Sequence, residues 1–160
     1  MTVLLDQLAK VWALHALDDG QRRAVLGDLL GLQLLFNPGA AFGTGAGYTI
    51  VLTLIALGAV IVLVRTASKL RDGIWEWGFG LFLGGALGNL IDRLFRDPGF
   101  GRGHVVDFID YNGWFVGNVA DLALTLAAVL LVLRAWQGVA LDGTREEPQT
   151  KPTEDNETHE

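Results

Sequence analysis

The sequence contains no cysteine, which excludes disulfide bonds, thiolate metal sites, a cysteine nucleophile and a cysteine-anchored lipid on this chain. Serine is almost as scarce. Ser68 is the only one, and no Gly-x-Ser-x-Gly motif occurs, so a serine peptidase is excluded. The histidines are His15, His104 and His159, and they form no His-x-x-x-His pair. We therefore expect no metallopeptidase site and no bound metal.

Basic residues are too few for nucleic-acid binding. The 160 residues include 12 Lys and Arg against 18 Asp and Glu, a formal net charge of −6. Residues 142–160 hold most of this excess of acid, so the rest of the chain is close to neutral. Hydrophobic residues make up 51% and the mean hydropathy is +0.36, which argues against a cytosolic globular domain.

Long stretches with few charges predict membrane-spanning helices, because about 20 residues cross a hydrocarbon core of ~30 Å. The candidate spans lie near residues 3–17, 48–64, 75–93 and 114–134. The first is too short to cross in full. We expect either a start methionine placed too late, which is favoured, or a truncated first helix.

The two ends of the chain are expected to share one side of the membrane. Arg65, Lys69 and Arg71 predict a cytoplasmic link between the second and third spans by the positive-inside rule. Residues 1–141 are predicted to form one membrane-embedded domain. Residues 142–160, rich in Glu, Thr and Pro, are predicted to be a disordered acidic cytoplasmic tail.

Strand and turn signals lie between the spans. Residues 29–36 are apolar with an ambiguous period, which predicts one or two short strands or an interfacial segment. Residues 104–111 have the branched and aromatic content of a short strand. The predicted fold class is therefore mainly helical, with a small strand-containing part.

Ionisable residues within spanning helices are costly, so each one suggests a function. Asp6 and Lys10 lie four residues apart on one helix face. They predict either a neutralising ion pair or a link from the first helix to polar groups near an active site. Asn89, Asp92 and Arg93 share a face at the end of the third span. They predict either a capped helix end with an Asp–Arg pair or part of a functional site.

Two further carboxyl groups stand near the last span. Asp121 has no Lys or Arg within one turn of its own helix, and Asn118 lies three residues before it. Such a carboxyl is solvated in a cleft, paired with a group from elsewhere, or neutral and hydrogen-bonded between helices. Asp107 precedes a turn before this span, so the two carboxyls are predicted to meet at the membrane boundary. A pair that shares one proton is equipped to activate water and to protonate a leaving amine.

Five motifs, in this order, resemble those of the lipoprotein signal peptidase (signal peptidase II) family. They are DQLAK at 6–10, NPGAAFG at 37–43, the block 84–93, VVDF at 105–108 and NVAD at 118–121. The resemblance implies four transmembrane helices with both ends cytoplasmic and a small extracytoplasmic β-rich subdomain. One departure is Gly117, where the family commonly has Phe before the last motif.

The resemblance also implies a function. Members cut the signal peptide from a bacterial prolipoprotein just before a cysteine that carries diacylglycerol, at the outer side of the inner membrane. Asp107 and Asp121 would be the catalytic pair, with no metal or other cofactor. The residues implied to shape the pocket and orient the substrate are Asn37, Gly39, Asn89, Arg93, Asn118, Asp6, Lys10 and Asp92.

The implied partners are the lipidated substrate and membrane lipids, with the chain itself expected to be a monomer. Residues 37–42 would form part of an extracytoplasmic cradle over the cleft. Small residues at Gly80, Gly84, Gly85 and Gly88 are expected to leave room for a substrate helix beside the third span.

Two other functions remain open from the residues alone. One is a small proton- or ion-coupled transporter with Asp92 and Asp121 as relay groups. Transporters usually show internal repeats and broken helices, and neither is visible in this sequence. The other is a non-catalytic membrane adaptor whose polar residues serve only helix association.

Overall fold

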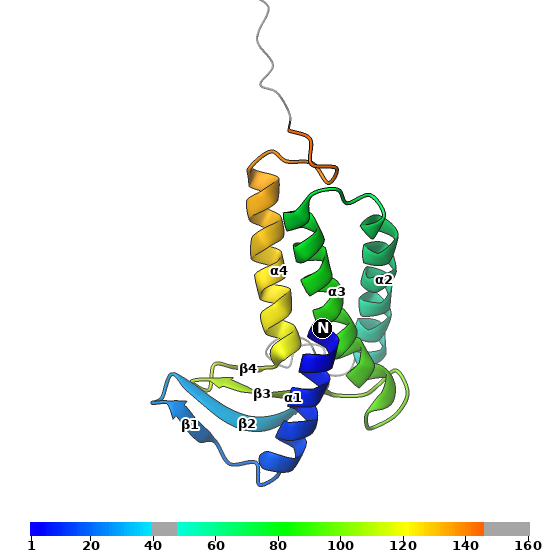
Figure 1. Cartoon of the computed structure of the whole chain (residues 1–160). Coiled ribbons are helices and arrows are strands. Elements are labelled where there is room, and N and C mark those ends of the chain that lie inside the picture. Colours follow the sequence, from blue (N-terminus) through cyan, green and yellow to red (C-terminus); the bar gives the residue numbers. More distant parts are fainter. Residues whose placement is uncertain (40–47, 146–160) are drawn as a thin grey trace, which may run out of the picture.

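The computed structural model describes residues 1–39 and 48–145. Within these ranges, α2, α3 and α4 lie side by side as a bundle, with α1 and the sheet at its lower end (Figure 1). In chain order the elements are α1 (Thr2–Ala16), β1 (Arg23–Leu26), β2 (Leu30–Asn37), α2 (Thr49–Ala67), α3 (Gly73–Phe95), β3 (Val105–Tyr111), β4 (Phe115–Gly117) and α4 (Val119–Trp136). The fold is mainly helical with a small antiparallel sheet, as the sequence predicts.

The last helix starts later than the sequence pattern suggests. The prediction that the span begins near residue 114 is wrong, because residues 115–117 form β4 and pair with β3. Asn118 then caps α4: its Oδ1 accepts the Asp121 N–H at 3.0 Å, and Asp121 Oδ2 accepts the Asn118 N–H at 3.1 Å. This reciprocal capping box satisfies two backbone donors and fixes the entry into α4.

The other helices lie close to their predicted spans. α2 and α3 run slightly past the predicted ends of the second and third spans. α1 has 15 residues, and at about 1.5 Å per residue it is shorter than a hydrocarbon core of ~30 Å. Met1 and Thr2 lie beside the middle of α3, near Gly80 and Gly84.

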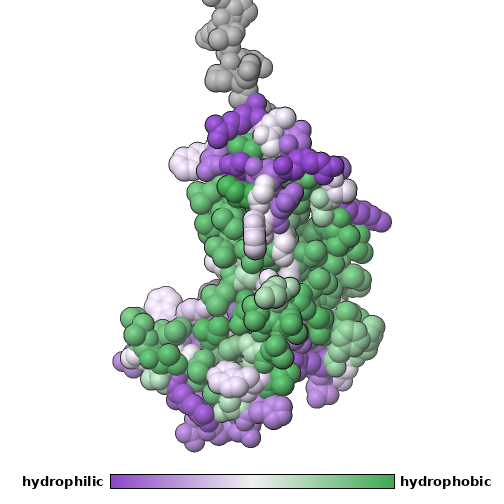
Figure 2. Space-filling view, viewed as in Figure 1, coloured by the Kyte–Doolittle hydropathy of each residue, from purple (hydrophilic) through white to green (hydrophobic). Residues whose placement is uncertain are grey.

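Two of the described helices, α2 and α4, are long and apolar enough to cross a membrane. Large apolar side chains of α2, such as Leu54, Ile55 and Val62, are more than half exposed. Figure 2 shows a hydrophobic surface over the bundle, with hydrophilic residues gathered at its upper end and along the lower edge. This surface is what helices in contact with lipid tails require.

The strands form one antiparallel sheet in the order β1-β2-β3-β4. β2 accounts for the ambiguous segment at 29–36, and the prediction of a strand at 104–111 is confirmed by β3. The register places Asn37 opposite Val105 and Leu35 opposite Asp107. α1 covers this sheet through Ala13 and through Leu17, the residue that follows the helix, and both pack with Phe108. The end of β2 is thereby held beside the polar residues of β3.

Glycines on α3 allow its neighbours to approach closely. A β-carbon at Gly85 would lie 2.6 Å from the backbone O of Ala120, and one at Gly84 would lie 2.6 Å from Cβ of Thr2. Gly88 likewise faces Asp6 and Ala120. The expectation that these three positions leave room for a substrate helix is therefore wrong, because α1 and α4 already fill them. Only Gly80, with nothing within 4 Å of an added β-carbon, remains open.

The upper end of the bundle is closed by polar contacts. Asp72 precedes α3, and its Oδ1 accepts the backbone N–H groups of Ile74 and Trp75, each at 3.1 Å. The same carboxylate forms an ion pair with Arg134 near the end of α4. Residues 142–145, where the sequence predicts disorder, form a turn in which Asp142 Oδ1 accepts the Thr144 N–H at 3.0 Å. The predicted disorder of residues 146–160 lies outside the described residues.

Candidate active site

A cavity of about 120 Å³ lies where the sheet meets the lower end of the bundle. Six residues that the sequence singles out line it. They are Asn37, Gly39, Asn89, Arg93, Asp107 and Asp121. Val105 and Phe115 complete the lining and were not among the predicted residues. The predicted convergence of the two carboxyl groups on one site is therefore observed.

Asp107 lies on β3 and is almost fully buried. Its Oδ1 accepts a hydrogen bond from Asn118 Nδ2 at 2.6 Å, and its Oδ2 accepts one from Asn37 Nδ2 at 3.0 Å. Burial raises the pKa of Asp107 to about 6; the Asn37 hydrogen bond opposes this rise and the negative charge of Asp121 adds to it. This carboxyl group therefore gains and loses a proton close to neutral pH.

Asp121 lies in the first turn of α4. Its Oδ1 accepts a hydrogen bond from Asn89 Nδ2 at 2.9 Å, and its Oδ2 accepts the Asn118 backbone N–H at 3.1 Å. The sequence shows no basic neighbour on its own helix, and in the structure its direct side-chain partner is an amide from α3. Asp121 is thus held by neutral donors next to a cavity.

Asn118 joins the two carboxyl groups. It is the residue before α4, is 1% exposed, and donates to Asp107 through its side chain and to Asp121 through its backbone. The same Nδ2 also lies 3.2 Å from Asn89 Oδ1. One residue therefore fixes the position of both carboxyls, although the two come from a strand and a helix.

Arg93 contributes a buried guanidinium to the cavity wall. Its Nη2 donates to the backbone O of Gly39. Its Nη1 is buried and has no hydrogen-bond partner in residues 1–39 and 48–145. A buried donor without a partner is costly, so this atom is suited to binding an oxygen of a ligand. Of the two interpretations of this helix end, the Asp92–Arg93 pair is not observed, because Asp92 forms ion pairs with Lys10 and Arg96.

Asn37 shapes the opposite wall. Its Oδ1 accepts the Gly39 N–H at 3.0 Å, which leaves Nδ2 facing Asp107. Residues 40–42, predicted to form part of a cradle with Asn37, lie outside the described residues. The ring of Phe115 lies within 2.7 Å of the position that a β-carbon at Gly117 would take. Phe115 therefore fills the space beside the glycine that departs from the family motif.

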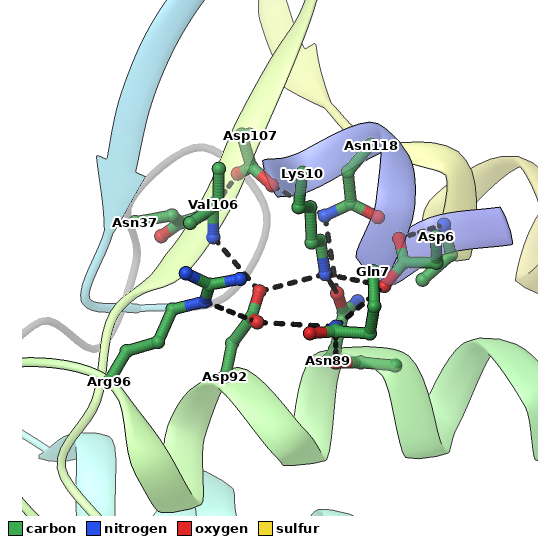
Figure 3. Close-up of polar contacts among 12 residues, drawn as sticks. Asp6, Gln7, Lys10, Asn37, Asn89, Asp92, Arg96, Val106, Asp107 and Asn118 are labelled. Atoms are coloured by element: carbon green, nitrogen blue, oxygen red, sulfur yellow. Dashed lines mark hydrogen bonds and ion pairs between the residues drawn. The ribbon is translucent and has the colours of Figure 1, made fainter. Parts of the chain in front are cut away.

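The remaining predicted residues form a polar cluster behind the cavity (Figure 3). Lys10 is fully buried and lies 2.9 Å from Asp6, 2.8 Å from Asp92 and 2.9 Å from Asn89. The Asp6–Lys10 ion pair is therefore present, and it also links α1 to polar groups of α3. Sequence reasoning missed the part played by Gln7, which donates to Asp6 at 3.1 Å and to the backbone O of Gly88 at 3.1 Å. Its place beside Asp6 in the first motif is the signal that could have pointed to it.

The arrangement favours chemistry by carboxyl groups and water. Two carboxyls, one of them titrating near neutral pH, face a cavity lined by amide groups and a guanidinium. The described residues contain no group of three or more His, Asp or Glu side chains placed to hold a metal ion. A water molecule placed between the carboxyls would lose a proton to one of them while the other donates.

Comparison with known families identifies relatives over most of the chain. The family model described as "Signal peptidase (SPase) II" matches residues 1–137. A protein named lipoprotein signal peptidase from Rhodococcus jostii (strain RHA1) is 48% identical over 140 residues, which cover 88% of this chain and 71% of that protein. A protein of the same name from Leifsonia xyli subsp. xyli (strain CTCB07) is 44% identical, covering 89% of this chain and 67% of that protein.

Solved structures agree with the fold. One described as a bacterial membrane enzyme is similar with a TM-score of 0.76 and 28% identity, over 92% of this chain and 90% of that chain. A second with the same description has a TM-score of 0.72 and 29% identity, over 84% of this chain and 86% of that chain.

Proposed function

The chain belongs to the signal peptidase II family, and we propose that it removes signal peptides from bacterial prolipoproteins with Asp107 and Asp121 as its catalytic pair. It is a membrane-bound peptidase. The substrate implied by the names of its relatives is a prolipoprotein, and the scissile bond precedes a diacylglyceryl-modified cysteine. The names of the relatives give no support to an ion-coupled transporter.

One observation carries the proposal: two carboxyl groups from separate elements border one small cavity, each bonded to a different nitrogen of Asn118. Structural carboxylates in proteins usually pair with a base. Neither Asp107 nor Asp121 forms an ion pair in the described residues, and both are held by amide N–H groups. Like charges in such a site favour a state with one shared proton, which general acid–base catalysis of peptide hydrolysis needs.

The reaction follows from that shared proton. One carboxylate takes a proton from water as the water oxygen bonds to the scissile carbonyl carbon, while the protonated carboxyl donates to the carbonyl oxygen. The C–N bond of the resulting gem-diol then breaks as the newly protonated carboxyl gives its proton to the leaving amine and the other carboxylate takes a proton from a gem-diol hydroxyl, which restores the pair with one proton. Nη1 of Arg93 is suited to donate a hydrogen bond to a backbone carbonyl oxygen of the substrate. This catalysis needs no metal or other cofactor.

Charge supports an orientation with the cavity at the extracytoplasmic face. The link with Arg65, Lys69 and Arg71 lies at the upper end of the bundle, as does the end of α4 (Figure 1). At the lower end, Arg22, Arg23 and Arg96 are paired with carboxylates and Arg93 is buried, whereas Arg102 is exposed. Among the described residues, this end therefore presents fewer unpaired cations than the upper end, where Arg65, Lys69 and Arg71 are exposed. The positive-inside rule then assigns the upper end to the cytoplasm. We propose four helices in the inner membrane, with the cavity at the outer lipid–water boundary and the chain acting as a monomer.

A cleavage assay tests the catalytic pair. Purified protein in detergent is given a diacylglyceryl-modified prolipoprotein, and product is measured for the wild type, Asp107→Asn and Asp121→Asn. We expect each variant to lose at least ~10²-fold in kcat, because each removes one acid–base group while keeping the shape of the side chain.

Asp110→Asn is the matched control. Asp110 is equally buried on the same strand, but its partner is Arg22 and it does not line the cavity. Its substitution is expected to change kcat by less than about threefold, since it touches no reacting group. Full activity of Asp107→Asn or Asp121→Asn would remove that residue from the pair.

A further inference from the structure

A fully buried ion cluster lies behind the catalytic pair without lining the cavity. Asp6, Lys10 and Asp92 each have 0% exposure. The Lys10 ammonium has three N–H donors, and Asp6, Asp92 and Asn89 each lie within 2.9 Å of it. All of its donors are therefore used inside the protein. Lys10 has none left for a substrate, although the sequence motif suggests a place in the pocket.

Two of the three acceptors lead to the backbone beside a catalytic residue. Asp6 Oδ1 accepts the backbone N–H of Ala120 at 2.9 Å, one residue before Asp121. Asp92 Oδ2 accepts the backbone N–H of Val106 at 3.1 Å, one residue before Asp107. One ammonium thus ties together the start of α4 and the start of β3.

The third acceptor leads to the catalytic side chains themselves. Asn89 Oδ1 accepts from Lys10 at 2.9 Å and from Asn118 at 3.2 Å, so both of its lone pairs are occupied. Its Nδ2 must then face Asp121, to which it donates at 2.9 Å. If the amide were flipped, its NH₂ group would point at the ammonium. Lys10 therefore fixes the direction of the hydrogen bond that Asp121 receives.

We infer that Lys10 is a positioning residue for both catalytic aspartates, acting through Asp6, Asp92 and Asn89. This inference rests on the proposed function of Asp107 and Asp121. Asp107 lies on β3 and Asp121 lies on α4. The distance between the two carboxyls therefore depends on the contacts that join this strand to this helix. A displacement of about 1 Å between reacting groups costs on the order of 10²-fold in rate. A buried ammonium with three fixed partners prevents such a displacement, because any movement breaks a charge-assisted hydrogen bond in a low-dielectric interior.

The substitution Lys10→Gln tests this role by steady-state kinetics on the lipidated substrate. We expect kcat to fall by about 10- to 100-fold with KM within about threefold of the wild type, because the chemistry loses alignment while substrate contacts remain. The control is Arg22→Gln. It also leaves a buried carboxylate, Asp110, without its cation, but that pair has no hydrogen bond to either catalytic residue. It is expected to lower the Tm and leave kcat unchanged. An equal fall in kcat in both variants would refute the inference.

A double-mutant cycle with Asn89→Ala separates positioning from general loss of stability. If Lys10 acts through Asn89, the double variant loses clearly less kcat than the product of the two single losses. Independent losses that multiply would contradict action through Asn89. If Lys10→Gln fails to fold, the variant Asp6→Asn/Lys10→Met/Asp92→Asn removes all three charges at once. Wild-type kcat in that folded variant would overturn the inference, and a reduced kcat with unchanged KM would support it.

The two proposals fail in different ways. If the function proposed for the chain is wrong, the wild type does not cleave, or Asp107→Asn and Asp121→Asn keep full activity. If only the role of Lys10 is wrong, those two variants are inactive while Lys10→Gln keeps the wild-type kcat.

Discussion

Two helices of the bundle start at opposite ends of the molecule with similar capping contacts but different second partners. Asn118 caps α4 beside the cavity, and Asp72 caps α3 at the upper end. The side chain of Asp72 also binds the cation Arg134, whereas that of Asn118 binds the carboxyl of Asp107. Both residues cap a helix, but Asp72 also forms an ion pair, whereas Asn118 also contacts two acidic groups. An ion pair compensates the charge of Asp72, whereas two acidic groups beside one amide do not compensate each other, so the second arrangement requires another explanation.

The largest expected effect comes from changing the second partner while keeping the cap. Asn118→Asp retains the oxygen that caps α4, since Asp and Asn are equally good N-caps. It replaces the Nδ2 that donates to Asp107 with an acceptor and adds a third carboxyl to the site. We expect kcat to fall by more than ~10²-fold, on the scale of removing an acid–base group, as measured by cleavage of the lipidated substrate.

Asp72→Asn makes the equivalent exchange at the other end. It keeps the acceptor for Ile74 and Trp75 and loses only the charge that pairs with Arg134. Its kcat is expected to stay within about twofold of the wild type, because Asp72 does not line the cavity and touches no reacting group. Equal losses in Asn118→Asp and Asp72→Asn would mean that both caps act only on folding.

A smaller effect on activity is expected from substituting Arg93, which lines the cavity, or Arg134, which pairs with Asp72 at the upper end. Arg93→Lys keeps the charge but loses the planar group that binds Gly39 and presents Nη1. We expect kcat/KM for the lipidated substrate to fall by about 10-fold, mainly through KM, as for loss of one hydrogen bond to a charged donor. Arg134→Lys, the control, changes an ion pair far from the cavity. A kcat/KM for Arg93→Lys that matches this control would exclude Arg93 from substrate binding.

The sequence pattern predicts the cavity end better than it predicts the boundaries of the elements. Asp107 and Asp121 are correctly brought together, because a carboxyl in an apolar span needs a polar partner wherever it lies. The start of α4 at Val119 is not predictable in the same way. Residues 115–117 are as apolar as the helix that follows, and only their pairing with β3 makes them a strand.

The glycines of α3 show the same limit. Their spacing indicates close helix packing, and Gly84, Gly85 and Gly88 do lie against α1 and α4. The pattern of one helix does not identify the partner, so a substrate and a neighbouring helix are indistinguishable from it. The contacts of Gln7 are not predictable from the sequence for a similar reason, because its partners Gly88 and Asp92 lie on another helix. Long-range contacts therefore decide what local patterns leave open.

The smallest effect on activity comes with a change in stability. The contributions of Asp107 at the cavity end and of Asp72 at the upper end to the stability of the fold are expected to change with pH in opposite directions. Burial raises the pKa of Asp107 to about 6, whereas the hydrogen bond from Arg134, opposed by burial, lowers the pKa of Asp72 below its ordinary value of 3.8. Because the pKa of Asp107 is raised, the folded protein holds the carboxyl proton more tightly than the unfolded chain does. The resulting stabilisation of the folded state is complete below about pH 4 and is lost as the pH rises through about 6. A lowered pKa gives stability above about pH 4 that is lost as the pH falls further.

Thermal unfolding in detergent between about pH 3 and pH 8 measures both contributions. For Asp107, the raised pKa corresponds to a loss of on the order of 3 kcal/mol in the free energy of unfolding as the pH rises from about 4 to above about 6. Asp107→Asn should abolish the fall in Tm between pH 4 and pH 6, and Asp72→Asn should reduce the fall below pH 4 while leaving the higher window unchanged. If the wild-type Tm rises between pH 4 and pH 6, Asp107 is stabilised as a carboxylate in the folded state. The acid of the proposed catalytic pair would then be Asp121, and Asp107 would be the base. The contacts of Asn118 with both carboxyls would be the same in either case.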